Sequence, residues 1–259
     1  MTIRLELAYD GSCFAGWQIQ PDQRTVQGTL LEALRDLEGR DVSVVAAGRT
    51  DAGVHATGQV ASFITGLSRL EPAKFRDALN ARLPRDVRVL CSRAAPEGFD
   101  ARRWAIERMY RYYLYPATVG LPHLRRHCWR IPRPPDLGEL NRIAGAIVGR
   151  HDFTTFATAG GPEGSRVRTV LRAAFYPQGR MLVFEIAADG FLRRMVRSIL
   201  GTILELERAG AGRAELQDAL RSMDRERAGT TAPARGLFLV RVRYGEGPPA
   251  VCVSGADDE

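Results

Sequence analysis

The sequence predicts an α+β fold built from two halves that share one order of strands and helices. Short runs in which apolar and polar residues alternate indicate strands, and apolar residues three and four positions apart indicate helices. The order strand, helix, strand, strand, helix, strand occurs twice along the 259 residues. The repeat is one of element order, because the two halves show no obvious sequence identity.

The first half contains six predicted elements. They are a strand at 3–9, a helix at 25–38, strands at 42–47 and 58–64, a helix at 71–82 and a strand at 87–93. The first helix carries one apolar stripe, formed by Val26, Leu30, Leu34 and Leu37. Thr25 is the expected N-cap, because its hydroxyl can accept a hydrogen bond from a first-turn N–H.

The second half repeats this order. Its elements are a strand at 109–115, a helix at 136–148, strands at 168–176 and 181–188, a helix at 191–208 and a strand at 237–244. The stripe of its first helix consists of Leu137, Leu140, Ile143, Ala144 and Ile147. Asp136 is expected near the start of that helix, and a further helix is expected around 213–223.

This element order is that of a ferredoxin-like unit, in which helices cover one face of a mainly antiparallel sheet. The predicted organisation is an N-terminal half at 1–105 and a C-terminal half at 106–245. Residues 246–259 contain Gly, Pro and acidic residues and are expected to form a frayed tail.

The charge of the chain favours a polyanionic partner such as nucleic acid. The net charge is +7 and the isoelectric point about 9.7. Lys74 is the only lysine, so almost all positive charge is arginine, a bias that genome composition also produces. Arginine clusters at 102–103, 108–111, 125–126 and 193–197 strengthen the nucleic-acid interpretation, because guanidinium groups suit bidentate phosphate contacts.

The composition also bears on the compartment. No apolar run reaches the roughly 18–20 residues of a membrane span, and residues 1–7 alternate like a strand rather than a signal peptide. The four cysteines are scattered without a Cys-x-x-Cys pair, which argues against a zinc ribbon or a disulfide scaffold and suits a reducing compartment. A cytoplasmic protein is therefore expected.

The loop Ala47-Gly48-Arg49-Thr50-Asp51-Ala52-Gly53-Val54-His55-Ala56 is the most informative segment. It is polar, lies between two apolar runs, and has one carboxylate, Asp51, between two glycines. A loop held by rigid strands is a common place for catalytic residues. An aspartate in a Gly-flanked turn is, however, usually a turn former or cap, and the loop alone does not decide between these interpretations.

The same loop resembles the active-site signature of the TruA-type tRNA pseudouridine synthases. Further similar stretches follow in the family's order, at 9–12, 16–20, 99–102, 110–112, 151–153, 168–170, 191–197 and 236–237. The resemblance covers residues 3–244. Arg193 and Arg194 stand where some members of the family carry histidines.

The resemblance implies a fold and a reaction. Two ferredoxin-like halves would face each other across a central RNA-binding cleft, and a homodimer would isomerise uridine to pseudouridine at positions 38 to 40 of the tRNA anticodon arm. Isomerisation oxidises nothing and imports no group, so no cofactor is expected. The target base must leave its stack before its glycosidic carbon is accessible.

The resemblance also assigns residues to the site. Asp51 would be the catalytic carboxylate, as a nucleophile at C1′ or as a base at C2′, two routes that the sequence leaves open. Tyr110 would stack on the uracil and take the C5 proton, and Arg197 would pair with Asp51 and keep it ionised. Arg49, Arg193 and Arg194 would contact the RNA.

Two other interpretations compete with this one. The spacings Asp51/His55 and His123/His127 are those of metal ligands on a helix. Neither segment has a helical pattern, so no metal site is expected. His55 is instead expected to anchor the loop through a hydrogen bond. The stronger competitor is a noncatalytic RNA-binding or chaperone protein, because ferredoxin-like units often bind RNA through aromatic residues. Such a protein would not need Asp51 in an intact loop.

Overall fold

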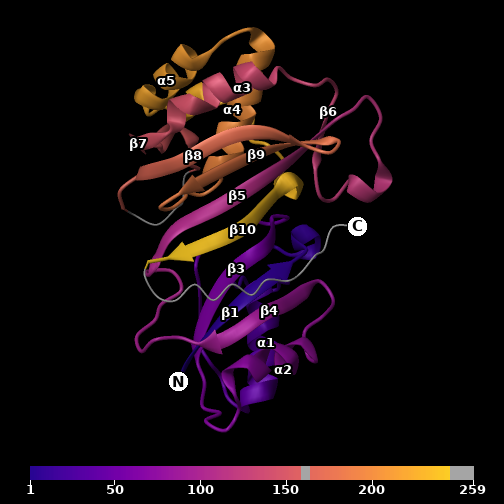
Figure 1. The fold of residues 1–259 in the computed structure, drawn as a ribbon, viewed down its shortest axis with the longest axis vertical. Helices are drawn as coiled ribbons and strands as arrows, with labels where there is room; N and C mark the ends of the chain where they lie inside the picture. Colours follow the sequence, from indigo (N-terminus) through magenta and orange to yellow (C-terminus); the bar gives the residue numbers. More distant parts are fainter. Residues whose placement is uncertain (159–163, 246–259) are drawn as a thin grey trace. The chain divides into compact units, whose positions relative to one another are not determined.

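The computed structural model describes residues 1–158 and 164–245, and these form two compact units (Figure 1). One unit comprises Met1–Ile106 together with the chain from Arg241, and the other comprises Glu107–Val240. The predicted tail, 246–259, lies outside the described residues. Within the described residues, no helix is both long and apolar enough to cross a membrane.

The first unit contains a four-stranded antiparallel sheet and two helices. Its elements are β1 (Thr2–Tyr9), α1 (Val26–Glu38), β2 (Val44–Ala46), β3 (His55–Ile64), α2 (Phe75–Asn80) and β4 (Val87–Ala94). β1 pairs with both β3 and β4, and β2 pairs with β3, which gives the strand order β4-β1-β3-β2. Burial alternates along β1, so that Ile3, Leu5 and Leu7 point into the core while their neighbours are half-buried.

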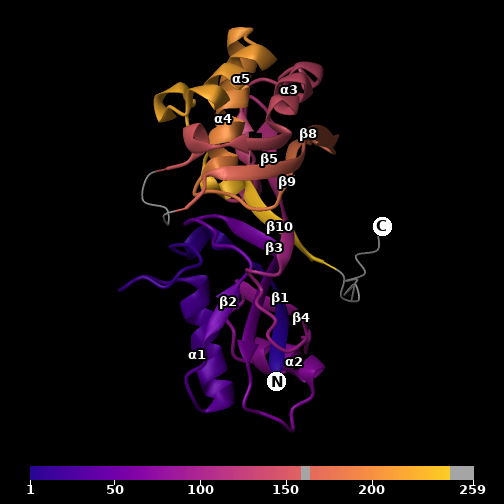
Figure 2. The same cartoon turned by 90° about the vertical axis from the view of Figure 1, so that its left-hand side faces the viewer.

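The second unit has a mixed but mainly antiparallel sheet. Its elements are β5 (Ala105–Pro116), β6 (Trp129–Ile131), α3 (Leu137–Ala144), β7 (Gly149–Asp152), β8 (Val167–Gln178), β9 (Met181–Ala188), α4 (Met195–Ala209), α5 (Arg213–Ser222) and β10 (Leu237–Tyr244). β5, β9, β8 and β7 pair antiparallel in this order, and β6 pairs parallel with β5. β10 lies beside β5, and its last residues, from Arg241, belong to the first unit. Figures 1 and 2 show α3, α4 and α5 together on one side of this sheet.

The strands and helices predicted from the sequence are present. The predicted Thr25 cap is confirmed, and Asp136, expected near the start of its helix, is the N-cap there. The Gly28 N–H donates to Oγ1 of Thr25 over 3.2 Å, and the Glu139 N–H donates to Oδ1 of Asp136 over 3.0 Å. The predicted α+β class with a mainly antiparallel sheet is confirmed. The further helix expected around 213–223 is α5.

The structure corrects several details of the predicted elements. The helix expected at 191–208 begins at Met195, because Arg194 has a left-handed backbone with φ of 61°, which the right-handed α-helix excludes. Leu137 is 37% exposed and so leaves the predicted apolar stripe. β6 and β7 were not predicted, because strands of three or four residues are too short to show a period.

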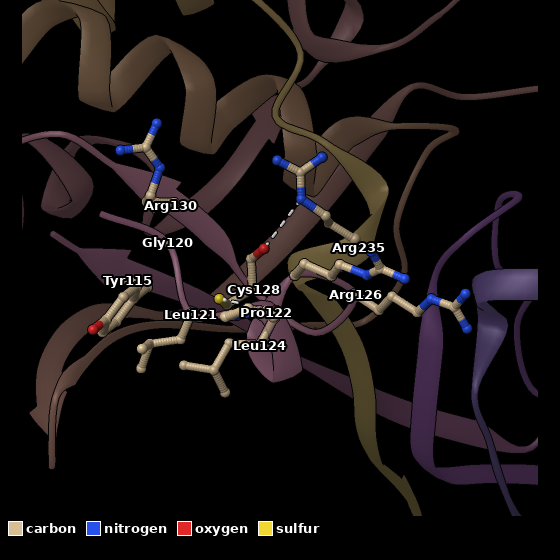
Figure 3. A pocket seen from close by; sticks show the side chains of 10 residues that line it. Tyr115, Gly120, Leu121, Pro122, Leu124, Arg126, Cys128, Arg130 and Arg235 are labelled. Atoms are coloured by element: carbon tan, nitrogen blue, oxygen red, sulfur yellow. Dashed lines mark hydrogen bonds between the residues drawn. The ribbon is translucent and has the colours of Figure 1, made fainter. Parts of the chain in front are cut away.

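The connection between β5 and β6 has no counterpart in the first unit. It contains a short 3-10 helix, Pro122–Leu124, and lines a pocket of about 490 Å³ (Figure 3).

Candidate active site

Asp51 lies on the loop between β2 and β3 in the first unit, and buried residues fix both sides of this loop. The Ala47 N–H donates to the Val60 carbonyl over 2.8 Å, and Nε2 of Gln59 donates to the Gly48 carbonyl over 2.8 Å. Gln59 is fully buried, so its amide is held inside the core. On the side that precedes Asp51, the loop therefore continues β2 and is held against β3 by these hydrogen bonds.

A hydrogen bond from the core supports the residue immediately before Asp51. Oγ1 of Thr50 lies 2.8 Å from the hydroxyl of Tyr9, and the two side chains are 6% and 4% exposed. Burial raises the pKa of Tyr9 to about 12. Its hydroxyl thus stays protonated at neutral pH and joins β1 to the Asp51 loop.

The segment after β1 packs directly against the backbone of the Asp51 loop. The Trp17 N–H donates to the Thr50 carbonyl over 3.0 Å, and the Gly53 N–H donates to the Phe14 carbonyl over 3.3 Å. Gly16 has φ of +106°, and a Cβ at this position would lie 2.8 Å from the Thr50 oxygen. Only glycine fits this contact, because the conformation and the space both exclude a side chain.

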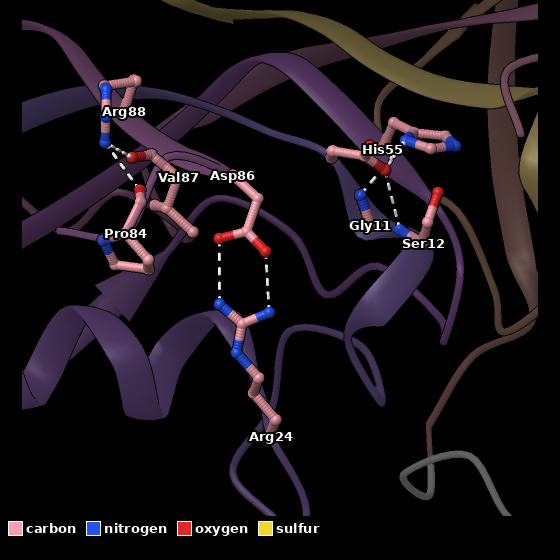
Figure 4. A network of polar contacts seen from close by, with 9 residues as sticks. Gly11, Ser12, Arg24, His55, Pro84, Asp86, Val87 and Arg88 are labelled. Atoms are coloured by element: carbon pink, nitrogen blue, oxygen red, sulfur yellow. Dashed lines mark hydrogen bonds and ion pairs between the residues drawn. The ribbon is translucent and has the colours of Figure 1, made fainter. Parts of the chain in front are cut away.

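His55 anchors the other end of the loop, as predicted. It begins β3 and is almost fully buried, and its Nδ1 accepts a hydrogen bond from the Gly11 N–H over 3.1 Å (Figure 4). Oδ1 of Asp10 lies 3.2 Å from the same nitrogen and also accepts from the Ser12 N–H over 2.9 Å. Hydrogen bonds therefore join the motif at 9–12 to the motif at 47–56, which contains Asp51.

Figure 4 also shows a solvent-exposed ion pair in the first unit. Nη1 and Nη2 of Arg24 donate to the two carboxylate oxygens of Asp86 over 2.7 and 2.9 Å. The pair joins the chain before α1 to the start of β4. Arg49 is exposed, as expected of a residue that meets a ligand from solvent.

Tyr110 lies on β5 in the second unit, opposite Ile186 on β9. It is 7% exposed, and its ring meets Phe191 edge to face, with centroids 5.1 Å apart and planes at 87°. This contact orients the ring through packing, next to the segment that leads into α4.

Arg197 lies in the first turns of α4, and its side chain is oriented by a backbone oxygen. Nε donates to the Ala232 carbonyl over 2.7 Å, and the Ala232 N–H donates to the Arg197 carbonyl over 3.1 Å. The segment that contains Ala232 lies close to α4, because a Cβ at Gly201 would be 1.7 Å from the Thr230 oxygen. The hydrogen bond from Nε to the Ala232 carbonyl thereby orients the guanidinium group.

Arg193 and Arg194 are both exposed and lie between Phe191 and α4. The Arg193 carbonyl accepts from the Thr158 N–H over 3.3 Å, and the Arg194 carbonyl accepts from the Ser198 N–H over 2.9 Å. Hydrogen bonds thus fix the backbone of this segment, while the two guanidinium groups face solvent.

The predicted site residues therefore fall into two groups. Asp51 and Arg49 belong to the first unit, and Tyr110, Arg193, Arg194 and Arg197 belong to the second. The pairing of Asp51 with Arg197 stays a prediction. Sequence reasoning missed the support that Tyr9, Thr50 and Gln59 give to the loop. The one available signal was the polar Gln59 directly before the apolar pair Val60 and Ala61 in a predicted strand.

A family model described as tRNA pseudouridine synthase matches residues 7–102 and 143–245, which includes parts of both units. This match and the named relatives define the class of protein, an isomerase that acts on tRNA.

The relatives place the chain within that class. A tRNA pseudouridine synthase A of Moorella thermoacetica is 42% identical over 244 residues, which is 93% of this chain and 99% of its own. The protein of that name from Geobacillus kaustophilus is 43% identical, over 94% of this chain and 95% of its own. The one from Treponema denticola is 39% identical, over 94% of this chain and 93% of its own. The chain belongs to the tRNA pseudouridine synthase family, and it pseudouridylates tRNA.

Among solved structures, one from a Cbf5-Nop10-Gar1 complex covers 92% of this chain and 58% of its own. Its TM-score is 0.38 and its identity 11%, a similarity too low to support an argument.

Proposed function

We propose that this protein isomerises uridine to pseudouridine at positions 38 to 40 of the anticodon stem-loop, with Asp51 as the essential residue. The observation that carries the proposal is the intact Asp51 loop, which is held by a side-chain bond from Tyr9 to Thr50 and by contacts of Gln59 and Gly16 with its backbone. A carboxylate that only formed a turn would not need such support from three separate segments.

The reaction balances without any other reactant. The C1′–N1 bond breaks, the uracil turns, C5 bonds to C1′, and the proton on C5 is lost while N1 gains one. In one route the Asp51 carboxylate attacks C1′ and leaves again when C5 attacks. In the other, it takes the C2′ proton to form a glycal and later returns it. Both routes require an ionised carboxylate.

Tyr110 and Arg197 have separate roles in this proposal. Tyr110 stacks on the extruded uracil and takes the C5 proton late in the reaction, and its packing against Phe191 supports this because it fixes the ring. Arg197 pairs with Asp51, since a positive charge favours the ionised acid. The hydrogen bond from Nε of Arg197 to Ala232 supports this role by orienting the guanidinium group.

RNA binding must offset the cost of base flipping, which is a few kcal/mol. Arg49, Arg193 and Arg194 are exposed and can bind phosphates in the proposal. The RNA would be recognised largely by shape, in a cleft between two ferredoxin-like halves. The strand order β4-β1-β3-β2 of the first unit supports the ferredoxin-like description of that half.

The proposal extends to assembly and compartment. The enzyme acts in the cytoplasm as a homodimer in which each tRNA touches both subunits. Light scattering at micromolar concentration should give about twice the 28.6 kDa of one chain. A mass near that of one chain would contradict the dimer and leave the proposed reaction untouched.

The decisive experiment is nucleoside analysis of unmodified tRNA after incubation with the purified protein. Pseudouridine at positions 38 to 40, formed equally with and without a chelator, is the expected result. Activity that disappears with chelator and returns with zinc would contradict the metal-independent mechanism, and pseudouridine at other positions would contradict the proposed target.

A further inference from the structure

A second candidate site lies in the second unit, in the pocket beside the β5–β6 connection (Figure 3). Its volume of about 490 Å³ is in the range of pockets for small organic ligands. Among the described residues that line it, four are arginines and none is acidic. The pocket therefore favours an anion and contains no carboxylate that could perform the isomerisation.

Backbone oxygens hold two of these arginines in place. Nη1 of Arg130 donates to the Thr118 carbonyl over 2.6 Å, and Nε of Arg235 donates to the Cys128 carbonyl over 3.2 Å. Each of these bonds uses one nitrogen of an exposed guanidinium group, which has five N–H donors. An arginine fixed in this way loses less conformational entropy when it binds a phosphate.

The rest of the pocket is apolar. Tyr115, on β5, is 8% exposed, and Leu121 and Leu124 are half-buried on the connection. In Figure 3 these three side chains lie below the guanidinium groups of Arg130 and Arg235. The pocket thus combines a cationic side with an apolar side, as the phosphate and the base of a nucleotide require. Single-stranded RNA is commonly recognised in this way, by bases that leave their stack and lie on aromatic or apolar side chains.

We propose that this pocket binds one nucleotide of the tRNA other than the uridine that is isomerised. Its phosphate contacts Arg130 and Arg235, and its base lies against Tyr115, Leu121 and Leu124. The proposal rests on tRNA as the substrate. A second copy of this chain is disfavoured as the occupant, because a protein of net charge +7 would approach four arginines.

The test compares variants of the full chain in binding to an unmodified tRNA transcript over a series of salt concentrations. R130Q/R235Q should weaken binding about tenfold or more and reduce the slope of log Kd against log salt by about 1.5, the value for two lost phosphate contacts. The control R180Q/R221Q removes two exposed arginines of the same unit that do not line the pocket, and should change affinity less than about twofold. L124A should weaken binding several-fold and leave the slope unchanged, because it removes apolar contact and no charge.

A second measurement uses the unaltered protein. Photo-cross-linking of tRNA that contains 4-thiouridine should join a nucleotide outside positions 38 to 40 to the peptide that holds Tyr115, Leu121 and Leu124. This readout does not depend on the folding of any variant. A cross-link of that peptide only to the target uridine, or to no nucleotide, would overturn the proposal.

Two further outcomes would also overturn it. One is a salt slope for R130Q/R235Q equal to that of the control. The other is a change in the mass of the protein by light scattering in R130Q/R235Q or L124A, which would mean that the pocket binds another copy of the chain. Failure of the proposed function is distinguishable, because it would appear as absent pseudouridine in the unaltered protein while binding and cross-links persist.

Discussion

The hydroxyl of Tyr9 and Oγ1 of Thr50 lie 2.8 Å apart in the core of the first unit, although 41 residues separate them in the chain. The bond connects β1 to the residue immediately before Asp51.

Tyr9→Phe removes the hydroxyl and leaves that of Thr50 without this bond. We expect a loss of about 1–2 kcal/mol in the free energy of unfolding, because an unmade buried hydrogen bond costs about that much. The pH dependence should also change. The pKa of Tyr9 is about 12 in the folded state and 10.0 in a model compound, so the folded state holds the proton more strongly. This stabilisation is complete below pH 10 and is lost as the pH rises toward 12, by about 2–3 kcal/mol.

Chemical unfolding of both proteins from pH 8 to pH 12 measures this effect. The unaltered protein should lose stability relative to Tyr9→Phe above pH 10. Burial also raises the pKa of Tyr112, but that residue is present in both proteins, so the difference isolates Tyr9. A constant difference across the range would contradict the buried, protonated hydroxyl.

Gly16→Ala should destabilise the first unit more than Gly39→Ala does. Both glycines have positive φ, +106° and +67°, so alanine is strained at either position. A Cβ at Gly39 meets nothing within 4 Å, whereas one at Gly16 would lie 2.8 Å from the Thr50 oxygen. We expect Gly39→Ala to cost about 1 kcal/mol and Gly16→Ala at least about 2 kcal/mol more. Thermal unfolding and turnover should both show the difference, and equal effects would mean that the contact between Gly16 and the loop is unimportant.

Asp51→Asn should abolish turnover and leave the fold intact. Asparagine keeps the shape and one carbonyl acceptor, but it removes the charge, the nucleophile and the base. Pseudouridine formation should fall by more than about a thousandfold, while tRNA affinity stays within a few-fold. Asp41→Asn, on an exposed side chain, is the control and should be fully active. An active Asp51→Asn enzyme, purified free of the host's own synthase, would show that Asp51 is a turn former.

Tyr110→Phe should separate stacking from proton transfer. Phenylalanine keeps the ring and its contact with Phe191, so binding should persist, while turnover should fall about a hundredfold if the hydroxyl takes the C5 proton. Tyr113→Phe is the matched control on the same strand, where the ring meets Phe238 at 5.2 Å. If Tyr110→Phe turns over as fast as Tyr113→Phe does, the hydroxyl has no part in catalysis.

Reversing the charge of Arg193 and Arg194 should weaken tRNA binding and flatten its salt dependence. Aspartate suits position 194, because short polar residues tolerate the left-handed backbone that Arg194 adopts. R193E/R194D should weaken binding at least tenfold at low salt. The salt dependence should flatten because a protein with fewer phosphate contacts releases fewer counterions when it binds tRNA. A binding titration at several salt concentrations, with R221E as control, measures the slope. An unchanged slope would show that both arginines are only solvated.

The sequence by itself determined the features that depend on residues close together in the chain. Three such features were predicted from residues a few positions apart: the alternation in β1, the Thr25 cap of α1 and the bounds of β9. The Asp51 loop was found from its own motif. Its role stayed a prediction, because a carboxylate between glycines has the same local pattern in a turn and in an active site.

The tertiary structure decided what depends on residues far apart. Tyr9 and Gln59 reach the Asp51 loop only once β1 and β3 are paired. β6 is a strand only because β5 supplies its partner, and Arg235 reaches Cys128 across 107 residues. Local periodicity has no information about such contacts, because they form when the chain folds back on itself and buries polar groups that must then find partners.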